Sequence, residues 1–181
     1  MTDFAIPDGA LVLLIGAAGS GKSTLAARLF APDEVLSSDA FREAVSGDSR
    51  DQTATEEAFD RLHADLDLRL AAGRLSVVDA TNVQGWARRS LLAVAARHGR
   101  PAVAVVLALP LDVSLAQNAA RTSGRVPAGV VRRHDRDLRT SLPRLVEEGY
   151  ATVVVLTVPG QVEALRIRRQ RNVPKERHPT L

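Results

Sequence analysis

The chain contains no cysteine among its 181 residues, which excludes disulfide bonds, thiolate metal sites and cysteine nucleophiles. It also lacks an apolar run approaching the ~20 residues that a membrane-spanning helix needs. The opening residues, MTDFAIPDG, have no basic start followed by an apolar stretch, so they do not match a secretory signal. We therefore expect a cytoplasmic protein without membrane association, with one sizeable core.

Aromatic residues are scarce as well, at 3% of the chain. We expect Trp86, Tyr150 and the four phenylalanines to occupy core or scattered positions. Few rings would then be available for stacking against nucleobases. Contact with a base would come from aliphatic groups such as Val130 or Val131, or from arginine planes.

Lysine is nearly absent, because Lys22 and Lys175 are the only two, and arginine supplies the remaining positive charge. Residues 1–100 carry 11 basic and 14 acidic side chains, whereas residues 101–181 carry 13 basic and 7 acidic ones. Arginine suits planar, paired contacts with phosphate. A general preference for arginine codons would explain the composition, but not its concentration in the second half.

Short apolar runs alternate with helical patterns along the chain, which predicts an α/β sandwich of three layers around a parallel sheet of about five strands. The five predicted strands are ALVLLIG, EVLSS, LSVVDAT, PAVAVVLAL and ATVVVLTV. The predicted helices are STLAARLF, TEEAFDRLHADLDLRLAAG, GWARRSLLAVAARHG, LDVSLAQNAART and VVRRHDRDLRTSL. We expect one domain over residues 1–160, followed by a polar C-terminal extension or linker over residues 161–181.

The strongest motif is GAAGSGKST, which fits the phosphate-binding pattern G-x-x-x-x-G-K-[ST] between a predicted strand and a predicted helix. Glycines let backbone N–H groups turn toward an anionic phosphate, and the helix N-terminus adds partial positive charge. Lys22 would reach the β- and γ-phosphates of ATP, and the Ser23 hydroxyl would join a Mg²⁺ shell. The expected nucleotide-binding residues are Gly16, Gly19, Ser20, Gly21, Lys22, Ser23 and Thr24.

The stretch EVLSSDAFR places Asp39 and Arg42 just after the second predicted strand. Ligands of open parallel sheets collect beyond the carboxyl ends of the strands, so both side chains are expected beside the phosphate loop. Asp39 could accept the proton of an attacking hydroxyl, and Arg42 could orient the acceptor or its phosphate. The alternative is structural: Ser38 or Asp39 would cap a helix, and Arg42 would be solvated.

The third predicted strand ends in VVDATN. Asp79 at this terminus fits an acid that holds Mg²⁺ through its water shell. Asn82 would fix the phosphate-side loop and is expected to contact the acceptor. A polar turn without a role in binding is the alternative.

The segment RTSGRVPAGVVRRHD joins two predicted helices and has the layout of a lid, expected at about residues 111–140. Arg121 and Arg125 would offset charge on the transferred phosphoryl group. Arg133 and the other arginines of the next helix could meet phosphates of a polyanionic acceptor. A solvated basic helix face is the alternative, and His134 is expected to be structural or at the surface.

Taken together, these motifs resemble the N-terminal 5′-kinase domain of bacterial polynucleotide kinase-phosphatases, within the P-loop phosphotransferase superfamily. The resemblance covers roughly residues 10–156. It rests on LIGAAGSGKST, EVLSSDAFR, DQTATEEAFDRLH, RLSVVDATNVQ, VVRRHDRDLR and EEGY, found in this order.

The resemblance implies that Asp39 is the general base for a nucleic-acid 5′-hydroxyl and that Arg42 binds the adjacent phosphate. It further implies an approach of Gln52 to the acceptor and a lid role for Arg121 and Arg125. The chain departs from the family at Gln117, where an arginine commonly precedes the asparagine. The family's phosphatase and ligase-like domains are also missing from this sequence, so they would belong to a longer parent chain or to separate partners.

Three functions remain open at this stage. The first is an ATP-dependent polynucleotide 5′-hydroxyl kinase acting on RNA or DNA, most simply on single-stranded ends in nucleic-acid repair. The second is a kinase of the same superfamily that phosphorylates a small-molecule hydroxyl on a sugar, antibiotic or nucleotide-sugar. The third is a non-catalytic nucleotide-binding module, which Asp39 and Arg42 disfavour because such a module needs no base.

Overall fold

The computed structural model describes residues 3–48 and 55–170, and its centre is a parallel sheet of five strands. The strand order is β3-β4-β2-β5-β6, which places β2 in the middle of the sheet. The strands are β2 (Leu11–Gly16), β3 (Val35–Ser37), β4 (Ser76–Asp79), β5 (Ala102–Leu107) and β6 (Thr152–Leu156). The predicted α/β fold with a parallel sheet of about five strands is confirmed.

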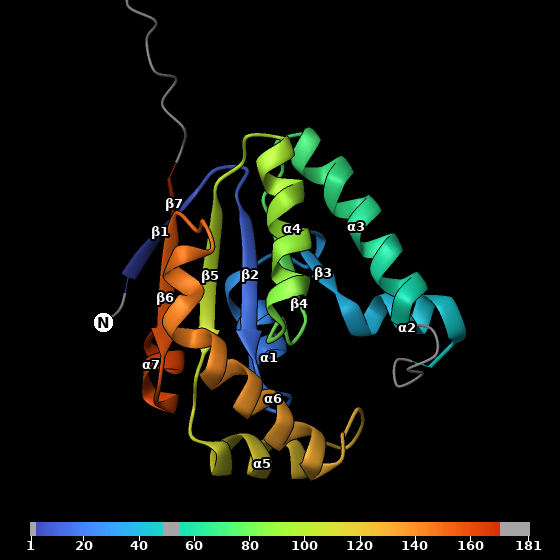
Figure 1. Cartoon of the computed structure of the whole chain (residues 1–181), viewed down its shortest axis with the longest axis vertical. Helices are drawn as coiled ribbons and strands as arrows, with labels where there is room; N and C mark the ends of the chain where they lie inside the picture. The colour runs from blue at the N-terminus through green and yellow to red at the C-terminus, as the bar shows by residue number, and fades with distance from the viewer. Residues whose placement is uncertain (1–2, 49–54, 171–181) are drawn as a thin grey trace, which may run out of the picture.

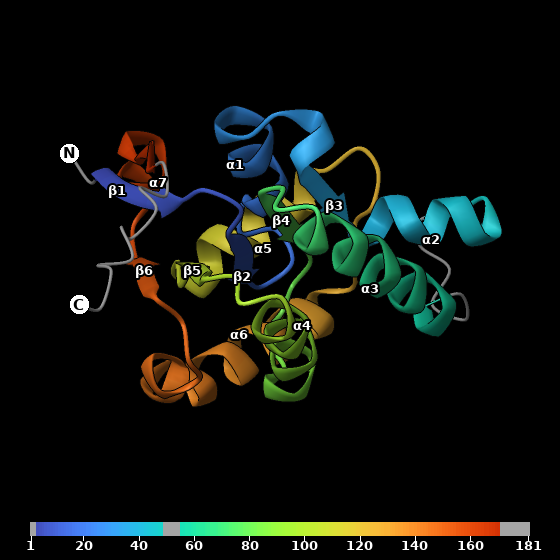
Figure 2. The same ribbon diagram turned by 90° about the horizontal axis from the view of Figure 1, so that it is seen from above.

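Helices cover both faces of this sheet, as Figure 2 shows from above. Alternate residues of β2 serve the two faces: Leu13 packs with α3 (Thr55–Ala71) and α4 (Gly85–Arg97), and Leu14 packs with α1 (Lys22–Leu29). Burial on both faces explains why β2 is a continuous apolar run. None of the helices in the described part of the chain has the length and apolar character of a membrane span.

The register of the strands brings the functional segments to one edge. Asp79, the last residue of β4, lies opposite Leu14 of β2 on one side and Ser37 of β3 on the other. The phosphate-binding segment follows β2, and α2 (Ser38–Ser46) follows β3 at once. Three neighbouring strands therefore deliver their polar continuations to the same carboxyl edge.

The predicted lid forms two helices beyond this edge, α5 (Leu111–Ala119) and α6 (Ala128–Ser141), at the bottom of Figure 1. Asn118 of α5 ties this helix to the segment that leads into α6. Its Nδ2 donates to the Val126 carbonyl oxygen (2.8 Å), and its Oδ1 accepts from the Val126 N–H (3.1 Å). The described residues also include two short 3₁₀ helices, η1 (Pro32–Glu34) and η2 (Leu142–Glu147).

The expected extension from residue 161 was wrong over its first ten residues. Helix α7 (Pro159–Ala164) leads into β7 (Arg166–Gln170), which pairs in parallel with β1 (Asp3–Pro7). Phe4 and Ile6 of β1 and Leu165 before β7 bury their side chains in the core under α1. This burial holds the ribbon against the domain although β7 itself is largely charged and exposed.

Candidate active site

Residues 16–24 form the expected phosphate loop between β2 and the first turn of α1. Gly19 (φ 81°) and Gly21 (φ 91°) adopt left-handed backbone conformations that other residues rarely tolerate. A Cβ atom at position 19 would lie 2.3 Å from the Ser114 carbonyl oxygen, because α5 packs directly on the loop. Glycine therefore permits both the turn and the close approach, and α1 offers its free N–H groups to an anion.

Lys22 is buried at the start of α1 and folds back over the loop. Its Nζ donates hydrogen bonds to the carbonyl oxygens of Gly16 (3.0 Å) and Ala17 (2.8 Å). Burial lowers the pKa of Lys22 to about 8, although the charges of Asp79 and Asp39 act in the opposite direction. Because burial outweighs the two carboxylates, an anion bound at the loop would stabilise the charged form of Lys22.

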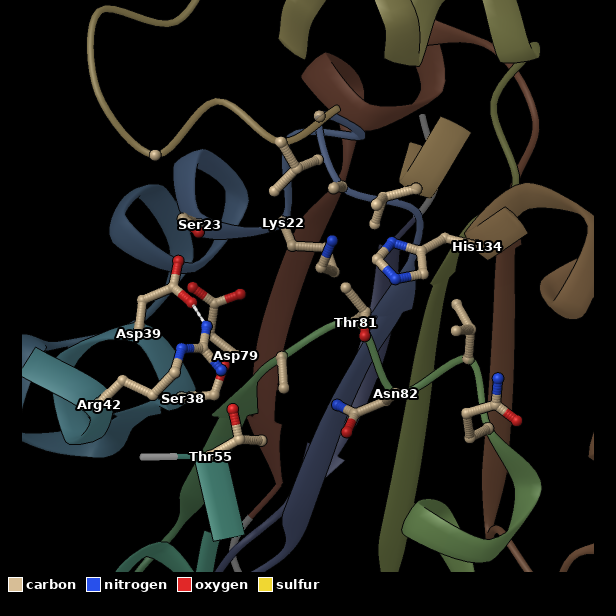
Figure 3. A pocket seen from close by; sticks show the side chains of 18 of the residues that line it. Lys22, Ser23, Ser38, Asp39, Arg42, Thr55, Asp79, Thr81, Asn82 and His134 are labelled. Carbon is tan, nitrogen blue, oxygen red and sulfur yellow. Dashed lines mark hydrogen bonds and ion pairs between the residues drawn. The ribbon is translucent and has the colours of Figure 1, made fainter. Parts of the chain in front are cut away.

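Asp39 and Arg42 lie in α2 at the wall of a cavity of about 640 Å³. They form an ion pair with each other, in which the Asp39 side chain is 58% exposed and that of Arg42 only 13%. The capping alternative is not what the structure shows, because Ser37 Oγ accepts the Ala40 N–H (3.4 Å) and Ser37 is the N-cap. The Asp39 carboxylate is thus available at the cavity, across from Lys22 (Figure 3).

Ser23 and Asp79 bring a hydroxyl and a carboxylate to this cavity. Magnesium binds hard oxygen ligands, keeps several waters, and is usually held by one or two carboxylates plus substrate phosphates. Within residues 3–48 and 55–170, no group of three histidine, aspartate or glutamate side chains could enclose a metal ion. The two oxygen donors therefore fit a magnesium ion that is shared with phosphate, rather than one in a protein cage.

Asn82 lies in the loop after β4, with a left-handed backbone (φ 49°) and a side chain that is buried. Its Nδ2 donates to the Leu14 carbonyl oxygen (2.8 Å), and the Gly16 N–H donates to the Thr81 carbonyl oxygen (2.9 Å). These bonds tie the loop to β2 and the phosphate loop. Asn82 also borders the cavity, but its amide nitrogen is committed to the protein backbone.

The same loop is held by Arg88, a residue that sequence analysis did not single out. Arg88 is 1% exposed and pairs with Glu148 through two bonds of 2.7 and 2.5 Å. Its Nη1 donates to the carbonyl oxygens of Asn82 and Val83, both at 2.9 Å. An arginine in an otherwise ordinary helical pattern gives no signal of burial, and its partner lies sixty residues away in the sequence.

The lid brings two of the predicted arginines to the cavity. Arg121 and Arg125 both line it, and their guanidinium groups hydrogen-bond to backbone carbonyls within the lid, Gly124 (3.1 Å) and Ala119 respectively. The charge of Arg121 also contributes to the low pKa of Lys22. The lid arginines therefore stand over the phosphate loop.

Helix α6 faces the cavity with Val130, Arg133 and His134. Burial and the charge of Lys22 lower the pKa of His134, whose ring lies beside Lys22 in Figure 3. The expected acceptor contact at Val131 was wrong: its side chain is fully buried against Ala17 and does not reach the cavity. Helical spacing alone did not distinguish the two neighbouring valines, and Val130 is the one exposed to the site.

Two further residues complete the comparison with the sequence. Gln52 lies outside the described residues. Trp86, expected in a core or scattered position, is instead 66% exposed at the rim of the cavity, in the first turn of α4. Counting aromatic residues could not reveal this placement.

A second cavity, of about 560 Å³, lies on the other side of the phosphate loop. It is lined by Thr24, Arg28 and Gln117, and by Pro159 and Val162 of α7. Gly19, Gly21 and Arg121 line both cavities. The phosphate loop thus separates two cavities. The larger contains Asp39, and the smaller is less charged and contains Gln117.

The fold and the loop define a P-loop domain of the α/β class. Residues 11–145 match the family model AAA_33, described as an AAA domain. Because this match spans most of the chain, the protein belongs to that family. A search of curated proteins found no match.

Solved structures share the fold at low sequence identity. A chain of the Pnkp1/Rnl/Hen1 RNA repair complex matches with a TM-score of 0.67 and 22% identity, over 77% of this chain and 47% of that chain. The AvrRxo1-ORF1:AvrRxo1-ORF2 complex with sulphate ions matches with a TM-score of 0.65 and 16% identity, over 82% and 54%. A gluconokinase from Sinorhizobium meliloti 1021 gives 0.54 and 18%, over 87% of both chains. The chain spans about half the length of the first two.

Proposed function

We propose that the protein is an ATP-dependent kinase that transfers the γ-phosphate to the 5′-hydroxyl end of a polynucleotide. The observation that carries this proposal is the shared cavity in which Asp39 and Arg42 lie across from Lys22 and the phosphate loop. A nucleotide-binding module without catalysis would have no use for a carboxylate at that place. Belonging to the AAA_33 family supports the nucleotide part of the proposal.

The donor would lie across the loop, with its phosphates against the α1 N-terminus and Lys22. The smaller cavity beside Thr24 and Gln117 would take the nucleoside. This arrangement directs the γ-phosphate toward the larger cavity and Asp39. The Ser23 hydroxyl, and Asp79 through water, would hold Mg²⁺, which neutralises phosphate charge when bound.

Asp39 would act as the general base. The 5′-oxygen of the acceptor forms a bond to the γ-phosphorus while the bond from that phosphorus to the bridging oxygen of ADP breaks. The hydroxyl proton passes to the Asp39 carboxylate, whose side chain is open to the cavity. Arg121 and Arg125 would offset the charge of the phosphoryl group in transfer.

Arg42 would bind the phosphate that follows the terminal nucleoside, exchanging part of its ion pair with Asp39 for the ligand. Arg133 would meet a phosphate further along the strand, and Val130 rather than Val131 would touch the terminal nucleoside. A cavity of about 640 Å³ lies within the usual range for small-ligand sites, so it accommodates one nucleotide and leaves the rest of a strand to the rim.

The same volume supports the second candidate, a kinase for a small-molecule hydroxyl, because a sugar or nucleotide-sugar would also fit. The arginines at the rim favour the polynucleotide, since a small acceptor would leave Arg133 without a partner phosphate. Any phosphatase or ligase activity that completes a repair reaction would come from other domains or proteins.

Transfer of labelled γ-phosphate tests the proposal. The acceptors would be single-stranded RNA and DNA with 5′-hydroxyl ends, together with a panel of sugars, nucleosides and aminoglycosides, each alone and in competition. Label on the oligonucleotides at higher kcat/KM than on every small acceptor is expected. Label confined to a small alcohol would overturn the polynucleotide proposal and establish the second candidate.

A further inference from the structure

Trp86 occupies an unusual place for the only tryptophan of the chain. It lies in the first turn of α4, is 66% exposed, and borders the cavity that contains Asp39. We infer that Trp86 is a stacking platform for a nucleobase of a single-stranded acceptor, next to the terminal nucleotide. The inference rests on the proposed polynucleotide kinase activity and defines the substrate as one with a second base.

Exposure of an apolar residue is common and means little by itself. The other large apolar residues with strong exposure in the described part of the chain are Leu68, Val146, Val155 and Val158, and none of them lines either cavity. Trp86 alone in this group combines exposure with a position at the site. A ring at the mouth of a cavity is where stacking can occur without occupying the reaction space.

The cavity wall that includes Trp86 is firm. Phe59 of α3 and Ala87 of α4 line the cavity as Trp86 does, and Phe59 packs against the main core. Arg88 anchors the first turn of α4 from beneath through its buried pair with Glu148. A platform on a well-anchored helix loses little conformational freedom when a base covers it.

A basic residue of α6, Arg133, lines the same cavity as Trp86. Gln84, two residues before Trp86, donates from Nε2 to Asp137 Oδ2 of α6 at 2.6 Å. Arg133 precedes Asp137 by four residues, so both lie on one face of α6. Arg133, Trp86 and Arg42 all line the one cavity. A cavity that offers both arginines and a ring suits a single strand, which presents both phosphates and bases.

Intrinsic fluorescence tests the contact directly, because Trp86 is the only tryptophan and emission under selective tryptophan excitation therefore comes from it. The protein would be titrated without ATP using short thymidine strands with a 5′-hydroxyl, the same strands with an abasic second nucleotide, and thymidine itself. Quenching that needs an intact second base is expected. Unchanged emission on strands whose binding is confirmed by anisotropy overturns the inference and leaves the proposed kinase activity standing.

Kinetics of three variants provide the second readout. Trp86→Ala should raise the acceptor KM of a short strand about tenfold, as loss of one stacked base does, with a much smaller effect on kcat. Trp86→Phe should restore most of the affinity, because it keeps a ring, whereas Leu68→Ala is an exposed control outside both cavities. Equal KM values for Trp86→Ala and wild type overturn the inference. Failure of wild type to phosphorylate any strand overturns the proposed function instead.

Discussion

Asp39 is the proposed general base, and because Ser37 caps α2, a substitution of Asp39 tests catalysis rather than helix capping. Asp39→Asn keeps the size of the side chain but removes its ability to accept a proton. We expect kcat to fall by ~10²-fold or more, with nearly unchanged ATP affinity. Steady-state kinetics and nucleotide titration measure both quantities.

Ser37→Ala is the matched control, because Ser37 is the N-cap of α2. Its loss should cost about 1 kcal/mol of stability through the helix end. If Asp39→Asn retained near-normal turnover and resembled the capping variant only in stability, Asp39 would have no role as a base.

The lowered pKa of Lys22 predicts how the stability of the fold depends on pH. Its pKa falls from 10.5 in the unfolded chain to about 8 in the fold, chiefly through burial. Below pH 8 both states carry the proton, and burying the charge reduces stability. Between about pH 8 and 10.5 the folded state loses its proton first, so the unfolded state binds more protons and stability rises with pH.

Lys22→Met removes this titration and keeps much of the volume. Relative to wild type, its stability advantage without nucleotide should shrink by about 2 kcal/mol between pH 7.5 and 9.5, given 1.36 kcal/mol per pKa unit. Urea unfolding of both proteins at the two pH values measures the difference, in which all other titrations cancel. A constant difference would mean that Lys22 has an ordinary pKa.

The sequence identifies those functional residues that lie in a motif or at a strand end. Lys22 lies in a recognisable motif after β2, Asp39 comes two residues after β3, and Asp79 is the last residue of β4, so a motif and the strand ends suffice to place them. Trp86 and Arg88 lie two residues apart in the same helix, yet the first is strongly exposed and the second is buried. That difference depends on Glu148 and the rest of the tertiary packing, which no local pattern contains.

At the scale of elements, the buried pair of Arg88 and Glu148 joins α4 to the end of η2 and supports the loop after β4. Glu148→Ala would leave the Arg88 guanidinium buried without its counter-charge. We expect a loss of about 3–5 kcal/mol in the free energy of unfolding.

The double variant Arg88→Leu with Glu148→Leu is the informative companion. It removes both charges, so the penalty of an unpaired buried charge disappears, although the Asn82 and Val83 carbonyls lose their donor. Part of the lost stability should therefore return. Urea unfolding of the single and double variants would show whether the pair behaves as a buried or as a surface ion pair. If Glu148→Ala cost less than about 1 kcal/mol, the pair would behave as a surface ion pair.

The elements differ in how readily sequence predicts them. Strands β2 and β5 are continuous apolar runs because both faces of the sheet are covered, and this pattern is visible in the sequence. Strands β1 and β7 were missed, since they pair across nearly the whole chain and β7 is RIRRQ, without an apolar alternation. The burial of Phe4 and Ile6 of β1 in the core explains why the two strands form.

At the scale of the whole molecule, the arginines at the cavity predict that acceptor affinity depends on salt concentration. Arginines at the cavity that bind strand phosphates release counterions, so acceptor affinity should fall with salt at a log–log slope near −0.7 per neutralised phosphate. Arg133→Ala should reduce that slope by about one contact and should act only on strands long enough to reach α6. Acceptor KM at several salt concentrations, with ATP KM as the internal control, measures the slope.

A slope near zero for wild type would contradict the polynucleotide acceptor, whereas an unchanged slope in Arg133→Ala would contradict only the role of that residue. The sequence predicts the sign of this effect from the excess of basic residues after residue 100. It does not predict which arginines contribute, because α6 turns Arg133 toward the cavity and Asp135 toward the protein interior.

The most direct test of the central claim is transfer of the γ-phosphate to a defined end. One short single strand would be prepared with a 5′-hydroxyl and again with a 5′-phosphate, and each would be incubated with γ-labelled ATP and Mg²⁺. The account predicts label only on the 5′-hydroxyl strand, removable by a 5′-phosphatase, and its loss in Asp39→Asn. No label on this strand, or equal label on the strand with a blocked end, would contradict a 5′-hydroxyl kinase with Asp39 as its base.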